Sequence, residues 1–274
     1  MTTLITLIHD LVNLFDYEFM RNAFAAGTIA AIVASLVGYF VILRSLAFAG
    51  HALSHIGFAG AAGAGLIHLQ PWAGQLILTL FAAAGMGSLG ERVSKSDIAV
   101  GIILAFSLGL GILFLHLYTQ YAGMANAILF GNLLGVSNQT IKWMLCIGLL
   151  SLLALAFISR PLLFASLEPE LAEAKGVSLQ KISILFFLIV AIAVTQASQI
   201  VGVLLVFTLL IGPAATALRI TRGIATGITM SLFLGVTTVW LGIILGYITD
   251  WPISFWISSI SLLLYLLSYA IRTE

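Results

Sequence analysis

Charged side chains are scarce in this sequence: Asp, Glu, Lys and Arg make up only 8% of its 274 residues, whereas 61% are hydrophobic. A water-soluble domain of this size carries far more charge on its surface, so the composition excludes that class of protein. The net charge of +1 argues against the basic surface that nucleic-acid binding requires. The mean hydropathy of +1.17 instead predicts a polytopic membrane protein.

The sequence has only one cysteine, and it lacks the common catalytic motifs. The one cysteine, Cys146, excludes an intrachain disulfide, and its apolar surroundings predict a small core residue. The segment between His51 and His55 reads HALSH, which lacks the glutamate of an HExxH zinc hydrolase. The sequence has no Walker-type phosphate loop and no GxSxG elbow. These absences favour a protein that moves a substrate without transforming it.

Hydrophobic runs of about 20 residues, the length that crosses a bilayer, recur along the chain. We predict nine spanning helices, over residues 22–43, 51–69, 72–90, 98–118, 143–159, 182–198, 201–218, 224–247 and 253–271. None contains Asp, Glu, Lys or Arg. The runs 182–198 and 201–218 are almost continuous, so a helical hairpin or re-entrant turn is an alternative there, with eight crossings. The predicted fold class is all-α, a polytopic membrane bundle.

Basic residues predict the orientation of this bundle, because cytoplasmic loops collect Lys and Arg. An N-terminus outside and a C-terminus in the cytoplasm leave only Arg21 and Lys142 on the outer side. The remaining basic residues then lie inside: Arg44, Arg92, Lys95, Arg160, Lys175, Lys181, Arg219, Arg222 and Arg272.

The first 20 residues differ from the rest of the chain. They carry Asp10, Asp16 and Glu18 and no basic leader, which argues against a cleaved signal peptide. Their apolar spacing predicts a helix lying at the membrane interface. Residues 21–274 are predicted to form one transmembrane domain, interrupted by a charged cytoplasmic loop over 160–181. Within that loop the segment EPELAEAKGV predicts a short helix, with Pro169 in its first turn and Gly176 at its end. On spacing alone it could equally be a solvated connector.

Four histidines lie in the predicted spans, where an ionisable side chain is costly and usually functional. His51 and His55 lie about 40° apart around a helix, so both imidazoles face the same way and could ligate one metal ion. Ser54 beside them could supply a supporting hydrogen bond. Interfacial histidines satisfied by water or carbonyl groups are the alternative. His68 is a candidate for the outer mouth, and His116 for a packing role. Small residues at 57, 61 and 65 predict close helix packing.

Several motifs together resemble one family. The segments RSLAFAGHALSHIGFAGAA, AILFGNLLGVS, EPELAEAKGV and VGVLLVFTLLIGPAATALRITR are similar, in order and spacing, to those of the zinc and manganese uptake permeases of ATP-binding cassette transporters. The resemblance covers nearly the whole chain beyond residue 20. It implies a type II permease like that of the vitamin B12 importer, working as a homodimer in the bacterial inner membrane. It also implies a cytoplasmic ATPase subunit and an extracytoplasmic solute-binding protein as partners.

The resemblance also implies roles for individual residues. His55 matches a family histidine that lines the metal path, and His51 stands where the family usually has aspartate. Asn132 stands where an acidic residue is common. Asp97 matches a family aspartate, although it could equally be the N-cap of a helix. Because two carboxylates are lost and imidazole suits zinc, we predict Zn²⁺ as the transported ion, with manganese, iron or a metal chelate as alternatives, and no permanently bound cofactor.

The cytoplasmic loop gains a role from the same resemblance. Residues 168–177 align with the family's coupling helix, which docks on the ATPase, and its matching positions are Glu168, Pro169, Glu170, Ala174 and Gly176. Farther along the chain, Pro213 is predicted to break or kink its helix.

A mechanism follows as a hypothesis, in which two copies bring four imidazoles to a shared path that the ATPase opens and closes. Three alternative functions are considered for the same sequence. A secondary metal transporter would run without an ATPase, an intramembrane metallopeptidase would need a general base, and a structural subunit would not need the histidines.

Overall fold

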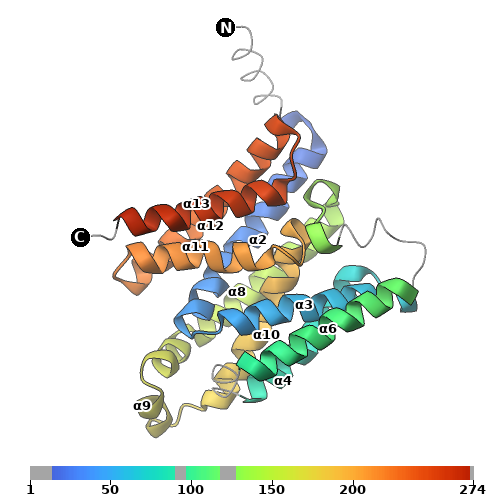
Figure 1. Ribbon diagram of the computed structural model, residues 1–274. Helices are drawn as coiled ribbons and strands as arrows, with labels where there is room; N and C mark the ends of the chain where they lie inside the picture. The colour runs from blue at the N-terminus through green and yellow to red at the C-terminus, as the bar shows by residue number, and fades with distance from the viewer. Residues whose placement is uncertain (1–13, 90–96, 118–127, 272–274) are drawn as a thin grey trace.

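The computed structural model describes residues 14–89, 97–117 and 128–271, and within these ranges the chain is helical with no strand (Figure 1). The longer elements are α2 (Glu18–Leu43), α3 (Ala47–Ala64), α4 (Pro71–Leu89), α6 (Asp97–Leu117), α8 (Asn138–Leu167), α9 (Pro169–Ala174), α10 (Leu179–Val201), α11 (Val206–Ile220), α12 (Ile224–Thr249) and α13 (Ile253–Ile271). Short 3-10 turns lie at η1 (Leu14–Asp16), η2 (Gly65–Ile67) and η3 (Leu133–Gly135).

Each of the nine predicted spans coincides with a helix, but the helices are not equivalent. Within the described residues, α2, α4, α6, α8, α10, α12 and α13 are long and apolar enough to cross a membrane. At about 1.5 Å per residue, the 15 residues of α11 fall clearly short of the roughly 30 Å hydrocarbon core. Helix α3 has 18 residues but is not among the helices that are both long and apolar enough. Most side chains of α3 are buried, so other helices rather than lipid surround it.

Two boundaries and one residue differ from the sequence-based expectations. Helix α8 continues through Arg160 and Pro161 to Leu167, so the loop predicted over 160–181 is helical in its first part. Helix α11 runs through Pro213 without ending there. Cys146 is exposed on α8, so its predicted place in the core is wrong. A membrane helix turns apolar residues towards lipid as readily as towards protein, and hydrophobicity alone does not separate the two. Residues 1–13 of the predicted interfacial segment, together with Arg92, Lys95 and Arg272, lie outside the described residues, and residues 14–20 form η1 and the start of α2.

Two groups of helices are joined by a buried centre. Helices α3, α4 and α6 pack together on one side, and α11, α12 and α13 on the other, while α2, α8 and α10 lie between them (Figure 1). The centre is lined by α2 and α10, the two spanning helices with the largest buried share. Glycines allow the closest approaches between helices. In lipid the hydrophobic effect does not drive helices together, so close backbone packing stabilises their association instead. Gly60 of α3 meets the backbone of Gly74 on α4, and Gly38 of α2 meets the Leu210 carbonyl of α11.

A glycine clasp closes the break between α10 and α11. We use this name for residues 128–132 and 199–204, which run side by side. The Val203 and Leu204 amides donate to the carbonyls of Ile128 and Leu129, at 3.0 and 3.3 Å. Gly202 has φ +76°, and its Cα faces the backbone of Gly131. Irregular backbone within a membrane bundle is tolerated only where other groups satisfy it, and the clasp meets that requirement.

Gly202→Ala is expected to destabilise the protein by about 2 kcal/mol or more, because alanine disfavours positive φ and its Cβ would strike the Leu129 carbonyl. Gly85→Ala is the matched control, since a Cβ at that helical position meets no atom within 4 Å. Thermal unfolding in detergent would compare the two variants. Equal melting temperatures would show that the clasp does not need a glycine.

Candidate metal-binding site

The two predicted metal-ligating histidines lie together on α3. His51 Nε2 and His55 Nε2 are 3.2 Å apart, and the ring centroids are separated by 4.6 Å with the planes at 89°. His55 is 7% exposed, whereas His51 is half-buried. One imidazole therefore lies inside the bundle and the other at its edge, and both present the same ring nitrogen to a common point.

The separation of the two nitrogens is that of a chelating pair. A tetrahedral ion bound to two imidazoles at about 2.0 Å holds their nitrogens roughly 3.3 Å apart. An octahedral ion with slightly longer bonds gives nearly the same separation, because its neighbouring ligands stand at right angles. The 3.2 Å between the two Nε2 atoms thus matches the nitrogen separation that either kind of ion requires. Without an ion, one Nε2–H donates to the other Nε2.

The outer ring nitrogens lack the support that a tight metal site has. His51 Nδ1 and His55 Nδ1 are buried and have no hydrogen-bond partner among the described residues. Ser54, expected to support a ring, instead donates to the His51 backbone carbonyl at 2.7 Å. Ligating histidines in stable metal sites usually donate their second N–H to a fixed acceptor. The pair is therefore suited to brief binding rather than to storage.

The other candidate ligands whose side chains are described do not join this pair. Among the described residues, no group of three or more His, Cys, Asp or Glu side chains could hold an ion. His68 caps η2 in the left-handed region, and like His116 it is exposed. Asn132 accepts from the Gly135 amide at 3.2 Å and caps η3, which gives it a local structural role. Helix α6 begins at Asp97, and the structure does not describe that side chain.

Sequence reasoning missed a line of buried uncharged polar residues between α4 and α10. Gln75 Nε2 donates to Ser198 Oγ at 2.5 Å, and the hydroxyls of Thr79 and Thr195 are 3.2 Å apart. Gly57 of α3 packs against Gln75 and Thr79. Gly57 and Ala61 lie on the side of α3 roughly opposite His55, so this polar line is separate from the imidazole pair. The sequence signal that could have revealed this line is the spacing of polar residues three to four apart within the apolar runs of α4 and α10.

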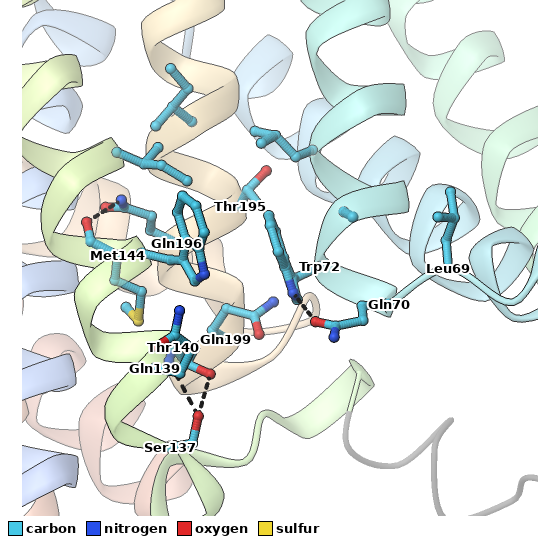
Figure 2. Close-up of a pocket in the computed structure, with 15 residues that line it drawn as sticks. Leu69, Gln70, Trp72, Ser137, Gln139, Thr140, Met144, Thr195, Gln196 and Gln199 are labelled. Atoms are coloured by element: carbon cyan, nitrogen blue, oxygen red, sulfur yellow. Dashed lines mark hydrogen bonds between the residues drawn. The ribbon is translucent and has the colours of Figure 1, made fainter.

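A cavity of about 560 Å³ opens beside this polar line, between α4, α8 and α10. Figure 2 shows Trp72, Gln199 and Thr140 around it, with Trp72 Nε1 donating to Gln70 Oε1 at 2.6 Å. Gln196 Nε2 donates to the Met144 carbonyl of α8 at 2.8 Å. The lining carries no charged side chain among the described residues, so this cavity offers a cation no counter-charge.

The segment predicted to couple to an ATPase forms its own short helix. Helix α9 begins at Pro169 and lies beyond the rest of the bundle at the lower left of Figure 1. Gly176 has φ +82°, and the Val177 amide closes the turn onto the Ala172 carbonyl at 3.0 Å. Ala172 is buried against the bundle, whereas Leu171 is 48% exposed. The helix is thus anchored on one side and open on the other.

The apolar helices define a class, that of a polytopic α-helical membrane protein. Residues 16–272 match the ABC 3 transport family, and the chain belongs to that family. The resemblance noted in the sequence and the predicted all-α polytopic fold are therefore confirmed.

Known proteins agree with this assignment over nearly the whole chain. A curated manganese import system permease protein, ScaB of Streptococcus gordonii, is 31% identical over 263 residues, which cover 96% of this chain and 94% of the relative. A chain in the structure of PsaBC from Streptococcus pneumoniae in complex with Fab matches with a TM-score of 0.86 and 29% identity, covering 96% of this chain and 95% of that one. A metal-chelate type ABC transporter in an inward-facing conformation shares the fold alone, with a TM-score of 0.64, 16% identity, and coverage of 92% and 85%.

Proposed function

We propose that this chain is the membrane subunit of an importer for a divalent transition-metal ion, and that the ion passes between His51 and His55. The single observation that carries the proposal is the 3.2 Å separation of the two Nε2 atoms inside the bundle. Two imidazoles whose Nε2 atoms lie at chelating distance, with no hydrogen-bond partner on either Nδ1 among the described residues, suit transient ligation. The relative ScaB, named for manganese import, supports the same class of cargo.

Two copies of the chain would complete the site. One copy supplies two nitrogen donors, and among the described residues no third His, Cys, Asp or Glu joins them. Transition-metal ions in proteins take four or more ligands. A symmetric pair of permeases facing a shared path would offer four imidazoles, and water could fill any remaining position. The half-buried position of His51 at the edge of the bundle agrees with a path shared between two subunits.

The energy and the cargo would come from partner subunits. The chain has no nucleotide-binding motif, so we assign ATP hydrolysis to a cytoplasmic subunit and ion delivery to an extracytoplasmic binding protein. Helix α9 supports the first assignment, because its exposed side carries Glu170 and Leu171 while Ala172 anchors it. In this arrangement α9 faces the cytoplasm of a bacterial cell and the N-terminus lies outside.

Manganese is the first candidate for the ion, and zinc is the second. The name of ScaB favours manganese. The donor set favours zinc, because two imidazoles without a carboxylate suit zinc better than the harder manganese ion. The nitrogen separation suits both, so geometry does not choose between them.

His51→Ala combined with His55→Ala is expected to lower ATP-driven metal uptake at least about 100-fold, because both protein ligands are lost. The measurement is uptake into proteoliposomes that hold the permease, its ATPase and the binding protein, with Mn²⁺, Zn²⁺ and Fe²⁺ supplied in turn. His116→Ala, at an exposed helical position on α6, is the matched control and should transport normally. Normal uptake by the double variant would refute the ligand assignment. Uptake by wild-type permease without the ATPase would favour a secondary transporter.

Gly176→Val is expected to reduce ATP-driven uptake about fivefold or more, because a β-branched residue resists the positive φ that ends α9. Gly176→Asn should keep most of the uptake, since asparagine tolerates that conformation and the position has open space around it.

Glu170→Lys should weaken co-purification with the ATPase subunit. Unchanged co-purification and unchanged ATP turnover in all three variants would count against a docking role for α9.

A further inference from the structure

Phe207 of α11 is the aromatic neighbour of the imidazole pair. Its ring centroid lies 5.1 Å from that of His51, with the planes at 72°, an edge-to-face contact. Phe207 and His51 are both half-buried, whereas His55 is buried. Phe207 also lines the groove between α11 and α13. The His51 ring therefore lies between a buried imidazole and an aromatic ring that borders an open groove.

The orientation of His51 depends on few contacts. Its Nε2 meets His55 Nε2, and its Nδ1 has no hydrogen-bond partner among the described residues. A half-buried imidazole held by one hydrogen bond can turn about its side-chain bonds, and then its Nε2 no longer faces that of His55. Edge-to-face packing supplies a second point of contact, because such ring pairs prefer a defined geometry.

We propose that Phe207 is a positioning residue for metal transfer: its ring holds His51 so that both Nε2 atoms face one ion. This inference rests on the proposed function and adds a residue on a second helix to the site. The ring is apolar and does not ligate the ion. Its effect passes through His51, so removing it lowers the fraction of permeases whose imidazoles are ready to receive an ion.

The placement of Phe207 also links the imidazole pair to the glycine clasp. Phe207 is the second residue of α11, and the clasp holds Val203 and Leu204 a few residues earlier. A shift of residues 128–132 would therefore carry the start of α11, and Phe207 with it, relative to α3. The clasp lies at the end of α10, the imidazoles are near the start of α3, and Phe207 is one contact between the two regions.

The test measures Mn²⁺ ions taken up per ATP hydrolysed in proteoliposomes that contain the permease, its ATPase and the binding protein. This ratio is chosen because loss of folded protein lowers uptake and hydrolysis together and leaves their ratio unchanged. With Phe207→Ala we expect the ratio to fall about fivefold or more, since small misplacements of ligating groups have large effects on transfer. Phe207→Tyr keeps the ring and should retain more than half of the wild-type ratio.

Phe255→Ala is the matched control, because Phe255 lines the same groove on α13 and packs against Trp251 and Trp256 instead of an imidazole. Its ratio should equal that of the wild type. If Phe207→Ala lowers membrane abundance, Phe207→Leu takes its place, with an expected fall of about twofold or more because the ring contact is lost.

An unchanged ratio in Phe207→Ala and Phe207→Leu, or an equal fall in Phe207→Tyr and Phe255→Ala, would overturn the positioning role. The histidine double variant separates this failure from failure of the proposed function. If that variant loses the ratio while Phe207→Ala keeps it, the imidazole path stands and the positioning role does not. If the double variant keeps the ratio, the path itself is wrong.

Discussion

The contact between the two Nε2 atoms depends on keeping α3 away from lipid. An unpaired polar group in hydrocarbon is costly, so two imidazoles can face each other in a membrane only where protein surrounds them. Helix α3 is short and mostly buried, with α4 and α6 packed closely along it and α10 and α11 adding contacts. Glycines at 57 and 60 let α4 approach on the side roughly opposite His55. The small residues and the histidines are thus two parts of one arrangement.

A second constraint governs the start of α11. The chain reverses between α10 and α11 through Gly202, and the amides exposed by the break are satisfied by residues 128 and 129. Regular helices would satisfy their own amides but would not bring α11 so soon onto α2 and α3. The irregular segment therefore sets where Phe207 meets His51, while Gly38 lets α11 approach α2 at the Leu210 carbonyl. The backbone hydrogen bonds of the clasp and the ring contact with His51 thus lie a few residues apart along the chain.

Much of this organisation was predictable, because hydropathy and charge are local properties. Every predicted span coincides with a helix, and the short helix after Pro169 was readable from proline, glutamate and glycine spacing. The pairing of His51 and His55 followed from helical periodicity. The errors arose where local signals were ambiguous. Arg160 and Pro161 suggested a loop although α8 continues there, and Cys146 lies among apolar residues that face outward. Ser54 was close to the rings in sequence but bonds to backbone.

By itself the sequence determined that the chain is a membrane bundle, where most of its helices lie, and that two imidazoles share one face, since each depends on composition or on spacing within a single segment. Only the tertiary structure decided that Gln75 and Thr79 pair with α10 and that the Phe207 ring packs edge-to-face against His51. These facts depend on how helices far apart in the chain approach one another. That approach is controlled by side-chain volume and by shared backbone hydrogen bonds, which no single segment carries.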